Sequence, residues 1–245
     1  MSDEHRADGS GFGGNQIVRT PTLDWLAATG VVFDNCYTPS PICVPGRQCL
    51  ACGQLPRTAG VERYGQDLPP GSMTVARRLA QHAYATVCCG KLHHDGVDQM
   101  QGWTRRVGSD CHLGDAFLDG LDAAALAACA APRGDGKWSD AKEIRRAGIG
   151  HGSGTQDCDA LALQGAHQMI ERYFLDPSYD RPGDHRPLLL KLSFNRPHYP
   201  YLTDEALFKY YLNRVTPFLD EEVLPHPFLG SRRVRPGVDA TAHEI

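Results

Sequence analysis

Three runs of the sequence are apolar on both faces for much of their length, and each has the length of a β-strand. They span residues 30–36, 83–89 and 187–194. Successive side chains of a strand point to opposite faces, so an apolar run without alternation predicts a strand that is covered on both sides. This pattern is typical of parallel strands buried between helices.

Segments with helical periodicity lie between and after these runs. The expected helices span residues 22–29, 46–52, 73–82, 155–174 and 203–212. Ser72 is a suitable N-cap for the third helix, and Asp204 and Glu205 place negative charge at the start of the last one, where the helix dipole favours it. The alternation of helices and buried strands predicts an α/β sandwich with a mainly parallel sheet between helices.

Two further stretches interrupt this pattern. Residues 131–154 are rich in glycine and charge, which predicts an insertion or surface loop, and residues 176–186 form a turn-rich connection into the last apolar run. The alanine-rich residues 123–131 predict a packed helix. No apolar run approaches the roughly 18 residues that a membrane-spanning helix needs, so we expect no membrane span.

The composition is that of an ordinary globular protein, with 41% hydrophobic and 22% charged residues among 245. The net charge is −4. Pairs of arginines are scattered along the chain rather than gathered in a basic stripe, which argues against a nucleic-acid partner. The sequence gives no indication of the oligomeric state.

The nine cysteines are an odd number, which favours free thiols and therefore a cytoplasmic location, with a periplasmic or secreted one left open. Cys49 and Cys52 are three residues apart on an expected helix, so we expect both to face the core. A redox or zinc site is the alternative for this pair. Cys88 and Cys89 end an apolar run and are expected in the core.

The segment Cys43-Val44-Pro45-Gly46-Arg47 fits the pattern Cys-x-Pro-x-Arg. It resembles the motif by which sulfatases mark one cysteine for oxidation to formylglycine, whose aldehyde hydrates to a geminal diol. The alternative interpretation is a buried cysteine followed by a proline that starts a helix. Because so short a pattern can arise by chance, further matches are needed to support it.

Other segments resemble the type I (formylglycine-dependent) sulfatase family in the family's own order. Residues 19–27 resemble its R-T-P-N-L-D-x-L-A helix, and residues 32–37 resemble the strand that delivers the modified cysteine. Gly90-Lys91-Leu92-His93 matches the family's G-K-x-H, and Pro197-His198-Tyr199-Pro200 matches its P-H-x-P. The resemblance covers most of residues 2–215 and implies an alkaline-phosphatase-like fold.

Two shorter matches refine this placement. Residues 53–56 and residues 98–103 are similar to the choline-sulfatase-like branch. The family also has a strand before the segment that begins at Ser2, and a later metal-binding Asp-His or Asp-Asn pair. Neither is found in this sequence, and residues 239–245 resemble the first turns of a helix. We therefore expect a partial N-terminal catalytic domain, truncated at both ends and inactive on its own.

Active sites of open parallel sheets lie at the carboxyl ends of the strands, and the matched residues follow the apolar runs. The resemblance implies a role for each of them. Cys43 would become the nucleophile, Arg47 would orient it, Lys91 would bind the sulfate, His93 would remove a proton to regenerate the aldehyde, and His198 would protonate the leaving alcohol.

The resemblance also implies a divalent metal, with calcium the usual ion. Asp3, Glu4 and the modified Cys43 are the expected ligands, and Glu4 is the weaker candidate because many relatives have Asp or Gln there. Terminal acids without a ligand role are the alternative for Asp3 and Glu4.

The predicted function is hydrolysis of a small-molecule or carbohydrate sulfate ester, after activation by a formylglycine-generating enzyme. The alternatives are a phosphoester or phosphonate hydrolase of the same superfamily, an inactive sulfatase fragment, and a zinc-binding cysteine/histidine module.

Overall fold

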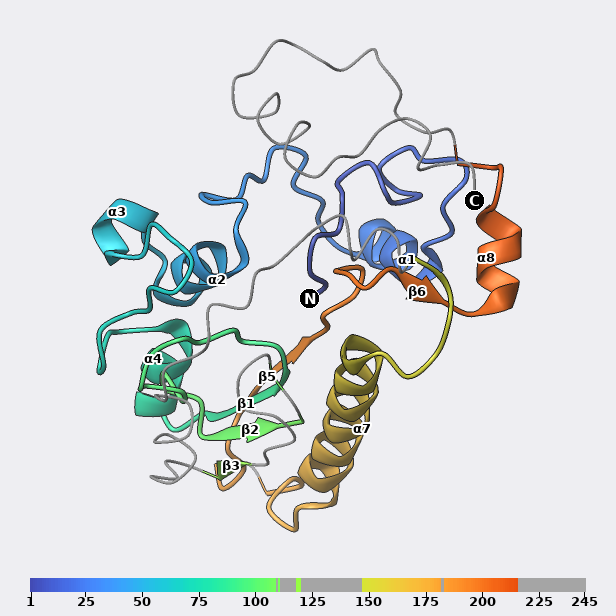
Figure 1. Ribbon diagram of the computed structural model, residues 1–245. Coiled ribbons are helices and arrows are strands. Elements are labelled where there is room, and N and C mark those ends of the chain that lie inside the picture. Colours follow the sequence, from blue (N-terminus) through green and yellow to red (C-terminus); the bar gives the residue numbers. More distant parts are fainter. Residues whose placement is uncertain (109, 111–117, 120–146, 182, 216–245) are drawn as a thin grey trace. The chain divides into compact units, whose positions relative to one another are not determined.

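A computed structural model of the chain describes residues 1–108, 110, 118–119, 147–181 and 183–215 (Figure 1). These residues divide into two compact units. The first unit contains residues 1–3, 33–108, 110, 118–119, 156–181 and 183–196. The second unit contains residues 4–32, 147–155 and 197–215.

The first unit is built on a four-stranded sheet with the strand order β3-β2-β1-β5. The central strand β1 (Ala85–Gly90) runs parallel to both of its neighbours, β2 (Arg105–Val107) and β5 (Leu188–Ser193). The short strand β3 (Leu118–Asp119) pairs antiparallel with β2. Two of the three predicted strands, and the mainly parallel character of the sheet, are thereby confirmed.

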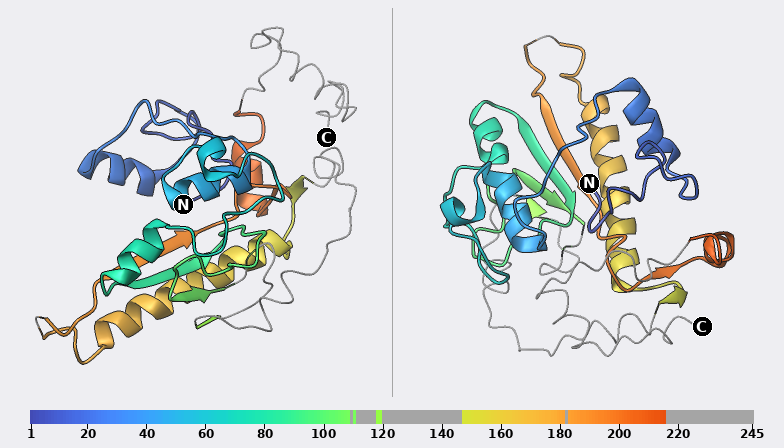
Figure 2. Two further views of the ribbon diagram at one scale, coloured as in Figure 1. Left: turned by 90° about the vertical axis from the view of Figure 1, so that its left-hand side faces the viewer. Right: turned by 90° about the horizontal axis from the view of Figure 1, so that it is seen from above.

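Helices cover both faces of β1. Val87 and Cys89 point to one face and pack against α7 (Gly154–Leu175), whereas Cys88 points to the other face and packs against α4 (Val75–Gln81). The right-hand view in Figure 2 shows the sheet between these two helices. This arrangement confirms the expected α/β sandwich and the expected burial of Cys88 and Cys89.

Helix α2 (Cys43–Cys52) begins three residues before its predicted start. Pro45 fits this first turn because the N–H that proline lacks would have no partner within the helix there. Cys49 is buried, and Cys52 packs against an apolar cluster that includes residues of α3 (Pro56–Ala59). The expected packing role of these two cysteines is confirmed.

The prediction of a strand at residues 30–36 is wrong. Val31 is 80% exposed and Phe33 is 77% exposed. A strand needs a neighbour for its backbone N–H and C=O groups, and the two edges of β1 are taken by β2 and β5. The apolar run that leads toward Cys43 is therefore an exposed loop.

The predicted cap of α4 is also wrong, because the helix begins at Val75 and Thr74 caps it. The Thr74 hydroxyl accepts a hydrogen bond from the backbone N–H of Arg77 at 3.1 Å. Ser72 instead donates its hydroxyl to the carbonyl oxygen of Pro69 at 2.6 Å. Both residues are suitable caps by type, so the turn that precedes the helix decides between them.

The second unit contains α1 (Pro21–Thr29), the parallel strand pair β4 (Gly148–Ile149) and β6 (Leu202–Thr203), and α8 (Glu205–Tyr211). The carboxylate of Asp204 accepts a hydrogen bond from the backbone N–H of Leu207 at 2.9 Å and so caps α8. The two helices predicted here, α1 and α8, and the acidic start of α8 are confirmed.

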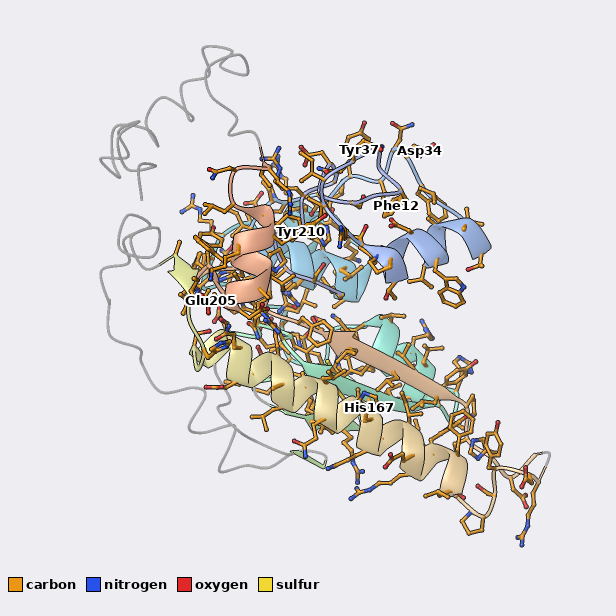
Figure 3. The ribbon with its side chains drawn as sticks, turned by 90° about the vertical axis from the view of Figure 1, so that its right-hand side faces the viewer. Phe12, Asp34, Tyr37, His167, Glu205 and Tyr210 are labelled. Carbon is orange, nitrogen blue, oxygen red and sulfur yellow. The ribbon has the colours of Figure 1, made fainter. Side chains whose placement is uncertain are left out.

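Aromatic and cationic side chains link the parts of the second unit. Tyr210 on α8, labelled in Figure 3, lies under the guanidinium groups of Arg19 at 4.1 Å and Arg214 at 4.2 Å from its ring centroid. The hydroxyl of Tyr211 accepts a hydrogen bond from the backbone N–H of Arg19 at 3.0 Å. These contacts join α8 to the segment that precedes α1.

Three predictions fall wholly or partly outside the described residues. The predicted loop at 131–154 contains β4, so that prediction is wrong for residues 148–149, and residues 131–146 are not described. The expected helices at 123–131 and 239–245 also lie outside the described residues. Across the described ranges, no helix combines the length and the apolar character that crossing a membrane requires.

Candidate active site

Three buried charged side chains meet in the first unit, and we call Asp3, Arg47 and Lys91 the charge cluster. The Nζ of Lys91 lies 2.5 Å from Oδ2 of Asp3, and Nη2 of Arg47 lies 3.1 Å from Oδ1 of the same carboxylate. Asp3 is 8%, Arg47 4% and Lys91 1% exposed. Burying a charge is costly unless a partner compensates it, and the carboxylate of Asp3 contacts both buried cations.

Gly90, the last residue of β1, determines how the chain reaches Lys91. Its φ of 90° lies in the left-handed region, and a Cβ atom there would lie 2.2 Å from the carbonyl oxygen of Ser193 on β5. The backbone N–H of Lys91 donates to that same oxygen at 2.9 Å. Glycine is therefore required where the strand ends and the lysine begins.

Arg47 lies one turn along α2 from Cys43 and contacts both strand ends. Its Nη1 donates to the carbonyl oxygen of Lys91 at 2.8 Å and to the hydroxyl of Ser193 at 3.1 Å. Ser193 is fully buried at the end of β5. The sequence analysis missed Ser193, although a polar residue at the carboxyl end of an apolar strand is a signal that could have identified it.

The backbone of Met1 places Asp3 at the same edge of the sheet. The N–H of Phe194 donates to the carbonyl oxygen of Met1 at 2.9 Å, and the amino group of Met1 donates to the carbonyl oxygen of Leu192 at 2.8 Å. This is the hydrogen-bond pattern of a parallel strand pair. Asp3 consequently lies beside the carboxyl end of β5, where sequence reasoning expected it.

Cys43 is the first residue of α2, and its Sγ lies within 4.8 Å of a carboxylate oxygen of Asp3. Burial raises the pKa of the Cys43 thiol, and the charge of Lys91 offsets this effect only in part. A thiol with a raised pKa is a poor source of thiolate, which is the reactive form of cysteine. The position therefore does not suit an unmodified cysteine nucleophile.

Asp3 is ionised in this environment. Burial alone would raise the pKa of its carboxyl, but the charges and hydrogen bonds of Arg47 and Lys91 outweigh burial and hold the pKa below its ordinary value. The three members of the charge cluster together carry one net positive charge. A buried site with excess positive charge suits an anionic ligand.

His93 follows Lys91 by two residues and is 4% exposed. Its φ of 59° is unusual for a residue with a side chain. The hydroxyl of Tyr64 lies 3.1 Å from Nε2 of His93, and the two rings meet edge to face with their centroids 5.5 Å apart. The imidazole of His93 is thus held in a defined orientation.

A buried ion pair lies behind the loop that carries Lys91 and His93. The carboxylate of Asp110 accepts the backbone N–H of Leu92 at 2.8 Å and that of His93 at 2.9 Å, and it pairs with Arg106. Burial alone would raise the pKa of Asp110, but Arg106 and these N–H groups hold it far below its ordinary value. The sequence analysis missed both residues of the pair.

The remaining two predicted site residues lie in the second unit. Nε2 of His198 lies 3.6 Å from Oε1 of Glu4, and Nδ1 of His198 lies 2.9 Å from the carbonyl oxygen of Tyr199. The side chain of His198 is 12% exposed and that of Glu4 is 44% exposed. Within the second unit, therefore, Glu4 and His198 contact each other.

The surroundings of Asp3 fit part of a divalent metal site. An ionised carboxylate is an oxygen donor of the kind that calcium and magnesium prefer, and the side chain of residue 43 lies close enough to offer a second donor. Asp3 and residue 43 would therefore hold such an ion from the first unit. A full calcium shell of six to eight oxygens needs further donors.

The chain is similar to proteins of a known family. A family model described as Sulfatase matches residues 1–221. The choline-sulfatase of Rhizobium meliloti (strain 1021) is 28% identical over 195 residues, which cover 80% of this chain and 36% of the relative. The arylsulfatase of Clostridium perfringens is 26% identical over 242 residues, which cover 94% of this chain and 47% of the relative. The chain spans less than half the length of these relatives.

Solved structures share the fold at low sequence identity. The structure of BT4656 in complex with its substrate D-Glucosamine-2-N, 6-O-disulfate has a TM-score of 0.57 at 17% identity, covering 89% of this chain and 37% of the other. The structure of Ps i-CgsB in complex with k-i-k-neocarrahexaose has a TM-score of 0.57 at 18% identity, covering 90% and 48%. The expected alkaline-phosphatase-like sandwich and the expected likeness to choline-sulfatase are confirmed.

Proposed function

The chain belongs to the sulfatase family, and from this premise we propose that it forms the nucleophile-bearing part of an enzyme that hydrolyses sulfate esters. The observation that carries the proposal is the position of Cys43 within the motif Cys43-Val44-Pro45-Gly46-Arg47. The motif opens a helix beside a buried cluster with a net positive charge. We also propose that residues 1–245 belong to one partial N-terminal catalytic domain.

We propose that Cys43 is oxidised to formylglycine by a formylglycine-generating enzyme. The hydrated aldehyde would supply the oxygen nucleophile that attacks sulfur. Two observations support this modification over direct use of the thiol. Burial raises the pKa of Cys43, which keeps the thiol protonated, and Arg47 of the same motif is fixed by hydrogen bonds to Lys91 and Ser193.

Arg47 and Lys91 supply the positive charge for binding the sulfate group. Both are buried and both already contact a carboxylate, so the cluster is preorganised for an anion and needs little reorganisation when one binds. Developing negative charge on the sulfate oxygens would be stabilised most strongly where water is excluded. Before substrate binds, the negative charge of Asp3 offsets the repulsion between the charges of Arg47 and Lys91.

The proposed proton transfers use two histidines. His93 is oriented by Tyr64 and by its backbone contacts, and it would take a proton from the second hydroxyl of the nucleophile. His198 would protonate the leaving alcohol. The contact between Nε2 of His198 and Oε1 of Glu4 at 3.6 Å supports this role, because it helps to hold the imidazole in place.

A divalent metal would be held by Asp3 and residue 43, with Glu4 as a further candidate. Calcium is the proposed ion because the donors on this chain are carboxylate and hydroxyl oxygens rather than nitrogen or sulfur. The ion would add positive charge that polarises the S–O bonds. Calcium titration monitored by calorimetry, with Asp3→Asn as the comparison, tests this assignment.

The proposed substrates are small-molecule or carbohydrate sulfate esters. Choline-sulfatase is the name of one relative, and two neighbours of the same fold were solved with D-Glucosamine-2-N, 6-O-disulfate and with k-i-k-neocarrahexaose. These compounds differ greatly in size. Comparing turnover of choline sulfate with that of a sulfated monosaccharide would distinguish the two classes.

A phosphoester or phosphonate hydrolase is the second candidate within the same superfamily. A sulfate ester carries one negative charge and a phosphate monoester carries two near neutral pH. We propose the singly charged sulfate ester as the substrate because its charge balances the single net positive charge of the charge cluster. Measuring turnover of 4-nitrophenyl sulfate and 4-nitrophenyl phosphate by the same preparation tests this preference.

The modification itself can be measured directly. After co-expression with a formylglycine-generating enzyme, the tryptic peptide that contains Cys43 should lose about 18 Da relative to its thiol form. In a full-length enzyme that contains residues 1–245, Cys43→Ala should abolish turnover of 4-nitrophenyl sulfate, whereas the matched change Cys52→Ser on the same helix should preserve it. An unmodified Cys43 in a host that modifies a control sulfatase would contradict the proposal.

A further inference from the structure

The loop between β1 and β2 carries two of the proposed site residues, and its conformation is unusual. His93 has a φ of 59° although it has a bulky side chain. Left-handed backbone at such a residue persists where the surroundings hold it in place. The contacts that hold His93 therefore bear on where its imidazole lies.

The main contact is the carboxylate of Asp110. One oxygen, Oδ2, accepts the backbone N–H of Leu92 at 2.8 Å and that of His93 at 2.9 Å. The other oxygen, Oδ1, lies 3.2 Å from the N–H of His93. Two consecutive N–H groups that point to one carboxylate fix the peptide plane between them, and with it the direction of the His93 side chain.

Arg106 on β2 holds Asp110 and the far side of the same loop. Its Nη2 pairs with Oδ2 of Asp110, and its Nη1 donates to the carbonyl oxygen of Gln99 at 2.8 Å and to the side-chain oxygen of Gln99 at 3.1 Å. Gln99 in turn donates to the carbonyl oxygens of His94 at 2.9 Å and Gly96 at 2.6 Å. The guanidinium of Arg106 thus contacts the loop directly at Gln99 and, through Asp110, at Leu92 and His93.

These groups are almost completely excluded from water. Arg106 is 3%, Asp110 6% and Gln99 1% exposed. A hydrogen bond to a charged group is stronger in such surroundings, and a lost partner leaves a buried group unsatisfied. Because water cannot replace a lost partner in this network, a change in one of its members should alter the position of His93.

We propose that Asp110, held by Arg106, is a positioning residue that sets the orientation of His93 for proton transfer. The inference rests on the proposed function, since it assumes that His93 moves a proton in sulfate ester hydrolysis. Asp110 bonds to the backbone of His93 and Leu92, so it acts through His93. The charge is essential to this role, because one ionised oxygen accepts both N–H groups and the guanidinium.

The chain provides a matched control for this proposal. Asp98 also pairs with an arginine, Arg77, at 2.7 Å, and it also accepts two backbone N–H groups, from Gly71 at 3.1 Å and Gln101 at 2.9 Å. It belongs to the same loop but does not bond to His93. Asp98→Asn therefore removes an equivalent charge without the proposed effect.

The experiment compares Asp110→Asn with Asp98→Asn in a formylglycine-bearing enzyme that contains residues 1–245 together with the rest of its catalytic domain. We expect Asp110→Asn to lower kcat for 4-nitrophenyl sulfate about 10²-fold with a change in KM below about threefold, as misplacement of a reacting group typically does. Asp98→Asn should stay within about threefold of the unchanged protein in both constants. Equal losses of kcat in the two variants, or an unchanged kcat in Asp110→Asn, would overturn the proposal.

A second readout does not depend on turnover. In NMR spectra of the isotopically labelled chain, Asp110→Asn should shift the Cα resonance of His93 and speed amide exchange at Leu92 and His93, and Asp98→Asn should not. If the unchanged protein hydrolyses no sulfate ester, the proposed function fails, and these spectra still decide whether Asp110 orients His93. Unaltered His93 resonances in Asp110→Asn would refute the inference independently.

Arg106→Lys covers the case in which Asp110→Asn does not fold. Lysine keeps the positive charge beside Asp110 but lacks the second nitrogen that reaches Gln99. We expect a smaller loss of kcat, about tenfold, with KM again little changed. A loss confined to KM would assign Arg106 to substrate binding and contradict the proposal.

Discussion

Asp3 and Glu4 are neighbours in the sequence, but they have different surroundings in the structure. The side chain of Asp3 is 10% exposed and contacts two cations, whereas that of Glu4 is 44% exposed and lies 3.6 Å from a histidine nitrogen. A buried charge affects the whole cluster around it, but a solvated charge is screened. Two acids that look equivalent as metal ligands should therefore respond very differently to neutralisation.

The largest effect should come from Asp3→Asn. The change would remove the carboxylate that both Arg47 and Lys91 contact, and breaking a buried ion pair typically costs about 3–5 kcal/mol of unfolding free energy. Loss of one preorganised charge at the reacting centre should lower turnover by about 10²–10³. Chemical denaturation and initial rates measure the two effects.

A surface carboxylate provides the control for Asp3→Asn. Asp8 pairs with Arg6 at 2.7 Å, and both side chains are more than half exposed. Asp8→Asn should leave the unfolding free energy almost unchanged, because water screens this exposed ion pair. If Asp8→Asn and Asp3→Asn destabilise the protein equally, the charge cluster is not the buried unit described above.

The next effect in size should come from Arg47→Lys. A lysine keeps the charge but cannot reach Asp3, Ser193 and the carbonyl oxygen of Lys91 at once, as the guanidinium does. We expect turnover to fall about 10²-fold with a change in unfolding free energy of about 1–3 kcal/mol. Turnover close to that of the unchanged protein would mean that charge alone suffices at this position.

The pH dependence of the unfolding free energy should test the ion pairs of Asp3. The folded-state pKa of Asp3 is held below its ordinary value of 3.8, so the stabilising contribution of its carboxylate is fully present above that value. The contribution is lost as pH falls through the depressed pKa. The stability gap between the unchanged protein and Asp3→Asn should be constant from pH 5 to pH 7 and shrink in stronger acid. A gap that widens in acid would contradict the assignment.

The smallest effect should come from Glu4→Gln. Its side chain is substantially solvated, so the unfolding free energy should change by less than about 0.5 kcal/mol. Turnover at saturating calcium should fall by less than about tenfold, because the carboxylate of Asp3 remains in place. A loss as large as that of Asp3→Asn would establish Glu4 as an essential metal ligand and remove the contrast between the two acids.

Sequence reasoning succeeded where a pattern is local. The structure has β1, β5 and α7 where the sequence predicts them. Each of these segments has a spacing of apolar residues that indicates its secondary structure. It failed for β2, whose Arg105 and Arg106 resemble surface residues until a buried partner is known. It also failed at residues 30–36, where an apolar run lacks a neighbouring strand.

The site could be predicted only where a family motif marks it. Arg47 and Lys91 stand in such motifs, whereas Ser193 and Asp110 do not. Ser193 contacts Arg47 across 146 residues of sequence, and Asp110 contacts His93 across 17. A polar contact between distant positions leaves no periodicity. The polar residue at the end of an apolar strand could mark Ser193 as a candidate, but its contact with Arg47 and that of Asp110 with His93 cannot be derived from the pattern alone.

The missing side chain of Gly90 has a mechanical consequence for the site. At this residue the central strand and its neighbour come so close that a methyl group would collide with the backbone of Ser193 and with Ala162 of α7. The close contact between the backbones of Gly90 and Ser193 thus fixes the positions of Lys91 and Ser193 relative to each other. Replacing Gly90 by a larger residue would therefore displace Lys91 and Ser193, although it would not change any charged residue of the site.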